Sequence, residues 1–202
     1  MSALTLDLKP SLQSVGVRLE PLIECHREGL RVAADEPRIW EHTPSKASGD
    51  GFTRWFDDAL ANADAGREAV WVVVQDGAIV GSTSYMAIEP AHRRLEIGHT
   101  WYAPAVWATQ VNPACKLALM SHAFETLGFN RVELKTDIRN LRSQAAIAKL
   151  GALKEGVFRS HMVRPDGSLR DTVYLSIIRP EWPAVRDRLQ RRLGLAPAAA
   201  ES

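Results

Sequence analysis

Residues 95–116 read LEIGHTWYAPAVWATQVNPACK and predict a strand, a loop and a helix in succession. Leu95 to Tyr102 has the apolar and aromatic content of a strand, and a loop containing proline follows it. A helix is predicted to begin at Asn112-Pro113, because asparagine is a strong N-cap and proline is tolerated in the first turn. A strand that leads through a loop into a helix N-terminus favours anion binding, since unpaired N–H groups face the loop. The local pattern alone is equally typical of a capped helix that binds nothing.

The composition indicates one globular domain without a global electrostatic preference. The chain has 202 residues, of which 46% are hydrophobic and 24% charged, and its formal net charge is +1. We therefore expect no nucleic-acid partner and no membrane partner. Cys25 and Cys115 match no metal spacing and are predicted to be buried thiols of a reducing compartment. The absence of a long apolar run or a signal-peptide core predicts a cytoplasmic protein.

Strands and helices alternate in an order that excludes a doubly wound nucleotide-binding fold. Asp76-Gly77 between two apolar runs predicts a β-hairpin, and no GxGxxG or GxxxxGK[ST] motif is present. We predict a single domain over residues 1–202, with flexible ends at 1–14 and 196–202. The other predicted strands cover 15–20, 69–74, 78–86, 131–136, 153–158 and 171–178, and the helices cover 23–34, 52–63, 113–127, 140–150 and 180–193.

This order, together with two quoted segments, resembles the GNAT acetyltransferase superfamily and its RimJ/RimL-like branch. The segments are LEIGHTWYAPAVWATQVNPACKLALMSHAFETLGFNRVELKTDIRNLRSQAAIAKLGALKEG and HMVRPDGSLRDTVYLSI. The resemblance is specific from about Glu96 to Ile178. It implies an α/β fold in which a mixed, mostly antiparallel sheet splays around an acyl-CoA cleft, with helices on both faces. It also implies acetyl-CoA as co-substrate and no metal.

The resemblance places the cofactor along the quoted stretch. The pantetheine arm is expected on the strand through Trp101 and Tyr102, and the pyrophosphate on the loop and helix start that contain Thr109, Val111, Asn112 and Lys116. Asn140 completes the expected cofactor-binding residues. The loop lacks the glycines that many members have, so side chains such as Thr109 and Asn112 are expected to replace backbone donors. For Lys116, an ordinary solvated lysine is the alternative to a phosphate ligand.

A second segment carries the predicted acid. Many GNAT enzymes have a tyrosine seven residues after the asparagine that corresponds to Asn140, where it protonates the leaving thiolate. The residue here is Ile147, which has no proton to give. The resemblance to RimL-like proteins points to Ser143 as the substitute, since positions three apart lie on one helix face. Water is the alternative proton donor, because a thiolate needs little acid help near neutral pH.

Glu96 is the leading candidate for the base that deprotonates the acceptor amine, and His99 is its rival. Glu96 lies between apolar residues on the strand, where partial desolvation would raise a carboxyl pKa toward neutrality. The alternative for Glu96 is an ion pair with Arg93 or Arg94. Side chains alternate along a strand, so Glu96 and His99 face opposite sides unless a bulge intervenes. Further candidates near the acceptor are His161, Asp171 and three tryptophans, namely Trp40, Trp55 and Trp101, all of which also suit a structural role.

The sequence thus predicts an acetyl-CoA-dependent N-acetyltransferase that acts by direct attack in a ternary complex. The acceptor is a primary amine, either a protein N-terminus or a small amine, and whether the chain forms a homodimer stays open. One alternative is a non-catalytic acyl-CoA-binding sensor. Another is an interaction protein that docks through the basic side of its last helix, which contains Arg186, Arg188, Arg191 and Arg192.

Overall fold

An eight-stranded mixed sheet forms the centre of the computed structural model, which describes residues 7–164 and 166–195. The strand order is β1-β2-β3-β4-β5-β6-β8-β7, and every neighbouring pair is antiparallel except β5 and β6. The strands are β1 (Leu12–Ser14), β2 (Val17–Pro21), β3 (Ala69–Gln75), β4 (Ala78–Glu89), β5 (Arg94–Tyr102), β6 (Arg131–Asp137), β7 (Leu153–Val163) and β8 (Leu169–Ile178). The predicted mixed and mostly antiparallel sheet is confirmed.

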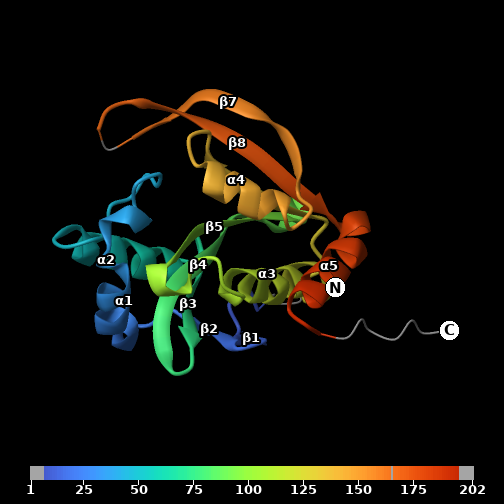
Figure 1. Ribbon diagram of the computed structural model, residues 1–202, viewed down its shortest axis with the longest axis horizontal. Coiled ribbons are helices and arrows are strands. Elements are labelled where there is room, and N and C mark those ends of the chain that lie inside the picture. The colour runs from blue at the N-terminus through green and yellow to red at the C-terminus, as the bar shows by residue number, and fades with distance from the viewer. Residues whose placement is uncertain (1–6, 165, 196–202) are drawn as a thin grey trace.

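The two faces of the sheet are covered by different helices, as Figure 1 shows. Helices α1 (Arg27–Ala34) and α2 (Gly51–Asp64) bury Leu30, Phe52 and Phe56 in one hydrophobic cluster with β3. Helices α3 (Val111–Ser121), α4 (Leu141–Ala148) and α5 (Trp182–Arg192) contribute to a second cluster on the other face. The sheet interior is apolar on both sides, since β3 is buried over almost its whole length.

The parallel pair β5–β6 opens after three residues. Arg94, Leu95 and Glu96 pair with Arg131, Val132 and Glu133, and no further pairing of these strands is found within the described chain. The register of β4 against β5 also shifts, because Thr83 alone lies opposite both His99 and Thr100. His99 has a φ of +46°, so this bulge contains a residue in the left-handed region. A bulge reverses the alternation of side chains: Leu95 and Ile97 pack in the α3 cluster, whereas Trp101 packs in the α2 cluster.

Several local predictions hold and others need correction. The Asp76-Gly77 hairpin and the Asn140 cap are confirmed, since the Ser143 N–H donates to Asn140 Oδ1 at 2.9 Å. Helix α3, however, begins at Val111 with Gln110 in the cap position, so the prediction of Asn112 as N-cap is wrong. Its last part is also not α-helical, because residues 122–126 form a π-helical turn.

The ends of the chain and one cysteine also differ from expectation. Leu12–Ser14, predicted within a flexible end, pairs with β2 as strand β1. The other part of that prediction, residues 1–6 and 196–202, lies outside the described residues. Cys25 is exposed, so the prediction of a buried thiol is wrong for Cys25 and right for Cys115. The neighbouring side chains Leu22 and Leu30 fill the core on this side, and Cys25 lies in a 3₁₀ turn that buries nothing.

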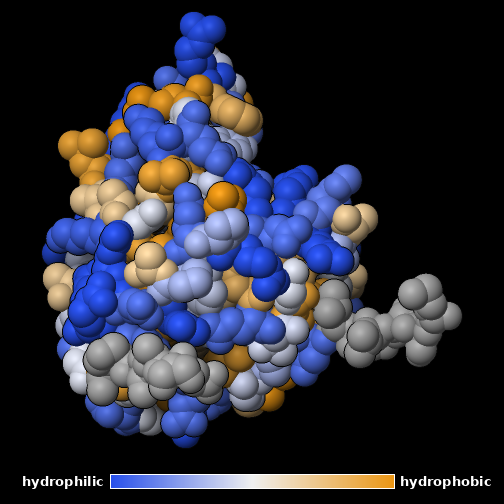
Figure 2. Space-filling model, turned by 90° about the vertical axis from the view of Figure 1, so that its right-hand side faces the viewer, coloured by the Kyte–Doolittle hydropathy of each residue, from blue (hydrophilic) through white to orange (hydrophobic). Residues whose placement is uncertain are grey.

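The outer surface is apolar mainly on the long β7–β8 hairpin, which arches over α4 (Figure 1). Leu153, Phe158, Val163 and Leu169 are exposed there, and Figure 2 shows hydrophobic side chains at this upper end of the molecule. Within residues 7–164 and 166–195, no helix has both the length and the apolar character needed to cross a membrane.

Candidate active site

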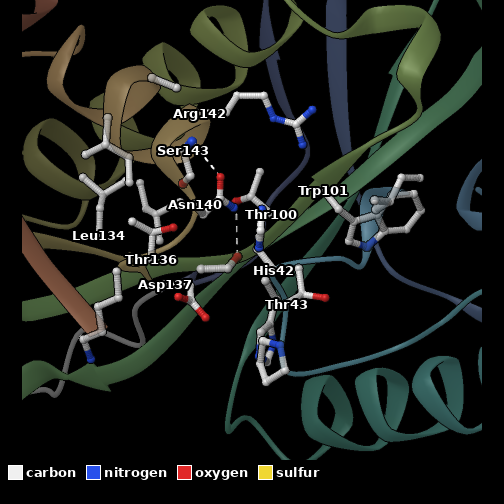
Figure 3. A pocket seen from close by; sticks show the side chains of 18 of the residues that line it. His42, Thr43, Thr100, Trp101, Leu134, Thr136, Asp137, Asn140, Arg142 and Ser143 are labelled. Carbon is white, nitrogen blue, oxygen red and sulfur yellow. Dashed lines mark hydrogen bonds between the residues drawn. The ribbon is translucent and has the colours of Figure 1, made fainter. Parts of the chain in front are cut away.

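A cavity of about 510 Å³ lies where β5 and β6 separate. Its volume is in the range of small-molecule sites. Figure 3 shows Asn140, Arg142 and Ser143 of α4 on one side of Thr100, with His42, Thr43 and Trp101 on other sides. The walls come from β5, β6, α3, α4, the segment between α1 and α2, and the β7–β8 hairpin. Seven of the nine predicted site residues line it, namely Glu96, Trp101, Tyr102, Asn112, Lys116, Asn140 and Ser143.

Glu96 lies on the cavity wall in an ion pair. Lys135 Nζ is 2.8 Å from Glu96 Oε2, and the Glu96 side chain is only 12% exposed. The alternative considered from the sequence, an exposed Glu96 paired with Arg93 or Arg94, is therefore wrong. Burial lowers the pKa of Lys135, but its hydrogen bond to Glu96 and the surrounding negative charges outweigh burial, so the net pKa is raised. Gly98 leaves room for this carboxylate, since a Cβ there would lie 3.1 Å from Glu96 Oε1 and 2.5 Å from Met86 Sδ.

His99 also borders the cavity, because the bulge changes the side to which it points. Its Nδ1 atom is 3.3 Å from Glu68 Oε2, and its side chain is 42% exposed. The two candidate bases therefore differ in environment: Glu96 is nearly buried beside a lysine, whereas His99 lies at the surface beside a carboxylate.

Lys116 is a buried amine and not the solvated lysine that was the alternative. Only 4% of the residue is exposed, and Nζ donates to Thr100 Oγ1 at 3.1 Å. Thr100 Oγ1 also lies 2.7 Å from Thr83 Oγ1, so the hydroxyl that binds the amine is itself hydrogen-bonded to the strand opposite the bulge. Burial lowers the pKa of Lys116 to about 8, although the nearby Cys115 opposes this effect.

The start of α3 has fewer free donors than a typical helix start. The Val111 N–H lies 3.3 Å from Thr109 Oγ1, the Ala114 N–H donates to the Gln110 carbonyl, and Pro113 has no N–H. Thr109 and the buried Val111 do not line the cavity, unlike the other predicted cofactor-binding residues. Thr109 instead makes local bonds and donates to the Val106 carbonyl. The Asn112 side chain faces the cavity and accepts from Tyr102 Oη at 3.3 Å.

The start of α4 forms the facing wall. Asn140 caps the helix through its Oδ1 atom and borders the cavity, so the same residue is both helix cap and cavity wall. Ser143, one turn later, is half-buried and lines the same wall. Ile147 lines it as well and is 8% exposed, which places an apolar side chain where a tyrosine was expected from the resemblance.

Trp107 joins three elements beside the cavity. The Arg142 guanidinium lies 4.0 Å from the centroid of the Trp107 ring, and the Arg38 guanidinium lies 5.7 Å from it. The indole N–H of Trp107 donates to the Tyr102 carbonyl at 2.7 Å, which fixes the ring against the end of β5. Two cations thus stack on one aromatic ring between the α1–α2 segment and α4.

The three predicted acceptor-side tryptophans form one cluster. Trp101 lies 5.3 Å from Trp40 and 5.5 Å from Trp55, measured between ring centroids, and all three line the cavity. Trp40 Nε1 donates to the Ala34 carbonyl. Trp101 Nε1 is buried and has no hydrogen-bond partner among the described residues. The cluster is therefore both packed core and cavity wall.

A buried carboxylate, that of Asp137, lies at the end of β6. Both oxygens of Asp137 accept from Arg164, at 2.8 and 3.0 Å, and Asp137 is only 1% exposed. The side chain of Arg170, which is 9% exposed, places Nε 3.9 Å from Asp137 Oδ2. Desolvation alone would raise the pKa of Asp137, but the hydrogen bonds from Arg164 and the Arg139 N–H lower it.

The two remaining candidates have different positions. His161 lines the cavity with its Nδ1 3.1 Å from Thr172 Oγ1 and its Nε2 3.3 Å from Tyr174 Oη. Asp171 does not line it, and its Oδ1 accepts from the Ser160 N–H at 2.7 Å within the hairpin. Asp171 thus stabilises the irregular part of β7.

No covalent nucleophile or metal cluster is present in the described part of the chain near this cavity. Burial raises the pKa of the Cys115 thiol to about 11, so this thiol stays protonated near neutral pH. No group of three or more His, Cys, Asp or Glu residues in the described ranges is arranged to hold a metal ion.

Several residues of the cavity wall were not predicted from the sequence. Lys135, Asp137, Arg142 and Arg170 all line the cavity, and Thr100 holds the buried lysine. The only available signal was the charged pair in Lys135-Thr136-Asp137 at the end of a predicted strand. Nothing local distinguishes Arg170 from the many surface arginines of the chain.

Comparison with known proteins gives one family. The model of the acetyltransferase (GNAT) domain family matches residues 17–153. Two curated relatives from Bacillus subtilis (strain 168) also match. One is named "Putative ribosomal N-acetyltransferase YdaF", with 31% identity over 110 residues, 54% of this chain and 59% of that protein. The other is named "Uncharacterized N-acetyltransferase YoaA", with 30% identity over 102 residues, 50% of this chain and 56% of that protein. The matches thus span less than two thirds of either relative.

Solved structures agree with this assignment over the whole fold. A GCN5-related N-acetyltransferase from Brucella melitensis has a TM-score of 0.84 and 27% identity, over 99% of this chain and 95% of that chain. RimJ from Mycobacterium smegmatis, solved in complex with CoA-disulfide, has a TM-score of 0.76 and 22% identity, over 92% of this chain and 94% of that chain, and at this identity shows the fold alone. The open β5–β6 pair and the matched family model lead to one conclusion: the chain belongs to the GNAT acetyltransferase family.

Proposed function

We propose that this protein transfers the acetyl group of acetyl-CoA to a primary amine, either a protein N-terminus or a small amine, by direct attack. The observation that carries the proposal is the cavity between β5 and β6, with the Glu96 carboxylate and the Asn140–Ser143 helix start among its walls. The relative named a ribosomal N-acetyltransferase supports a protein acceptor. Membership of the GNAT acetyltransferase family supports a coenzyme A ligand.

Each wall has a chemical task in this proposal. An alkylammonium has a pKa near 10, so the amine must lose a proton before it attacks the thioester carbonyl. Glu96 accepts this proton, directly or through water, and Lys135 holds its carboxylate in place. The carbon–sulfur bond then breaks, and the thiolate takes a proton from Ser143 or from water. The cavity residues proposed to bind the coenzyme are Trp101, Tyr102, Asn112, Lys116 and Asn140.

The positions of Thr109 and Val111 change one part of the cofactor site. Because neither lines the cavity, we propose that both act by shaping the start of α3 and not by contacting the coenzyme. The Arg142 and Arg38 guanidinium groups on Trp107 offer positive charge near this loop, where backbone donors are few.

One observation favours the second candidate, a non-catalytic acyl-CoA sensor. Ile147 puts an aliphatic side chain at the position where the resemblance led us to expect a phenol. A sensor would keep the coenzyme-binding residues and would not need Glu96 or Ser143 as catalysts.

Two measurements separate these functions. Acetyl-CoA at about 100 times its dissociation constant stabilises a protein by roughly 2.7 kcal/mol, which a thermal melt detects. Release of free CoA thiol with a panel of amines and N-terminal peptides then reports transfer. Stabilisation with thiol release supports the transferase, stabilisation without it supports the sensor, and no stabilisation by acetyl-CoA would contradict both.

A further inference from the structure

Arg170 is a buried cation with no hydrogen-bond partner among the described residues. Its guanidinium makes no hydrogen bond to any residue that the structure describes, and Nε is buried with no acceptor. The residue is 7% exposed and lines the large cavity. Guanidinium has five N–H donors and stays charged in proteins, so burial without acceptors is costly.

Asp137 offers Arg170 an opposite charge but no hydrogen bond. Its two oxygens already accept from Arg164, at 2.8 and 3.0 Å, and its Oδ1 also accepts the Arg139 N–H at 2.8 Å. Arg170 Nε, at 3.9 Å, is beyond hydrogen-bond distance from this carboxylate. The Asp137 carboxylate therefore lies near two guanidinium groups, and the one that hydrogen-bonds to it is that of Arg164.

The other carboxylates at this end of the cavity also have partners. Lys135 lies 2.8 Å from Glu96 and 3.6 Å from Glu133, and Arg131 lies 3.0 Å from Glu133. Desolvation and the charge of Arg164 lower the pKa of Arg170, whereas the charges of Asp137, Glu96 and Tyr174 raise it. The charge of Arg170 therefore acts in the same part of the cavity as the proposed base.

The side chains that line the cavity carry more positive than negative charge. Lys116, Lys135, Arg142 and Arg170 line the cavity together with only two carboxylates, Glu96 and Asp137. The coenzyme's phosphates would meet Arg142, which lies beside the Trp107 loop. Arg170 comes from β8, next to His161 and Met162 of β7 in the lining, and so belongs to the hairpin side.

We propose that Arg170 binds a carboxylate of the acceptor, so that this protein selects amines with a carboxylate a few bonds away. A charge-assisted pair with the acceptor would satisfy the buried donors and direct the amine toward Glu96. The carboxylate is either the α-carboxylate of a small amino acid or the side chain of an acidic residue at the start of a peptide. This inference rests on the proposed function for the identity of the site, and it adds the class of acceptor.

The test uses matched acceptors that differ only in charge. One pair consists of short peptides with aspartate or asparagine at the second position, and the other of a free amino acid and its amide. Wild-type kcat/KM is expected to favour the carboxylate member of at least one pair by roughly 10–100-fold, the range for a charge-assisted hydrogen bond. The pair that shows the preference identifies the source of the carboxylate.

Variants assign the preference to Arg170. R170Q is expected to lower kcat/KM for the carboxylate member to the level of its neutral partner and to leave the neutral partner within about threefold, while R170K keeps part of the preference. The control is R159Q, which removes an exposed arginine of the same hairpin that does not line the cavity. R159Q is expected to keep both the preference and the melting temperature.

A binding measurement makes the result independent of turnover. Calorimetry with the same pairs in the presence of CoA is expected to show the same preference in the wild type and its loss in R170Q. Equal affinities and rates within both pairs of the wild type, or a preference that survives in R170Q, would overturn this inference while leaving the transferase function intact. No stabilisation by acetyl-CoA and no transfer to any acceptor would instead overturn the proposed function.

Discussion

The cleft between β5 and β6 has a closed end, where Arg94–Glu96 pairs with Arg131–Glu133, and an open end beyond them. At the closed end Lys135 of β6 pairs with Glu96 of β5, and Arg94 of β5 pairs with Glu133 of β6, which also lies near Arg131 and Lys135 of its own strand. At the open end Lys116 has one neutral hydrogen-bond partner, and Arg170 has none among the described residues. Buried charges are expensive unless paired, so paired charges hold the strands together, whereas unpaired cations are best explained by a ligand that is not part of the chain.

The largest expected effect is at the closed end. Glu96→Gln keeps the size of the side chain and removes the base, so turnover near neutral pH is expected to fall by about 10²–10⁴-fold while acetyl-CoA binding stays nearly intact. Raising the pH toward the pKa of the amine should recover part of the rate, because more acceptor then arrives unprotonated. Steady-state rates against pH measure this, with His99→Asn as the control. If His99→Asn abolishes the pH dependence and Glu96→Gln keeps it, the base is His99.

The buried lysine at the open end makes a prediction about stability. The pKa of Lys116 is lowered from 10.5 to about 8 in the folded protein. At pH 7 the amine is therefore buried in its charged form, which lowers the free energy of unfolding. Lys116→Met is therefore expected to raise the free energy of unfolding at pH 7 by on the order of 3 kcal/mol and to weaken acetyl-CoA binding by about 1–2 kcal/mol.

The free energy of unfolding is expected to change with pH in a direction set by the lowered pKa of Lys116. Between about pH 8 and 10.5 the unfolded chain binds the Lys116 proton and the folded protein does not, so wild-type stability rises with pH relative to Lys116→Met. Cys115, with a pKa raised from 9.0 to about 11, has the opposite effect above pH 9, but both proteins contain it. Urea unfolding at pH 7, 9 and 10 measures the difference. A constant difference between the two proteins would show that the amine is not perturbed.

Ser143 tests whether the open end supplies a proton. If its hydroxyl protonates the thiolate, Ser143→Ala is expected to lower turnover by up to 10²-fold with unchanged cofactor affinity. Ser143→Thr, which keeps a hydroxyl, is the matched control. A rate within a factor of about two of the wild type would assign the proton to water.

The smallest expected effect concerns the exposed cation beside the cavity. Arg142 lies 4.0 Å from the Trp107 ring centroid, and an exposed cation–π pair contributes about 0.5–1 kcal/mol. Arg142→Ala is expected to lower the free energy of unfolding by this amount, and Arg142→Lys by less. A double-mutant cycle with Trp107→Phe measures the coupling, and additive effects would mean that the two side chains do not interact energetically.

Features that depend on neighbours along the chain could be predicted from the sequence. Asp76-Gly77 predicts a hairpin because few residues suit such a turn, and Asn140 caps α4 through an atom three residues from its partner. The order of strands and helices follows from the same local periodicity, and the resemblance supplied the family. Local signals were weaker at Asn112, which was predicted to cap α3. The helix begins one residue earlier, at Val111, and the Asn112 side chain accepts a hydrogen bond from Tyr102.

The pairing of charged side chains, by contrast, depends on the three-dimensional fold. The bulge at His99 and Thr100 depends on pairing with Thr83, and it determines that Trp101 and Ile97 lie on opposite faces of the sheet. Lys135 reaches Glu96 because two strands distant in sequence lie side by side. Among the described residues Arg170 has no hydrogen-bond partner, because Arg164, which follows β7 in the turn of the same hairpin, already binds Asp137. Such pairings depend on three-dimensional distance and on competition among several partners, which no local pattern contains.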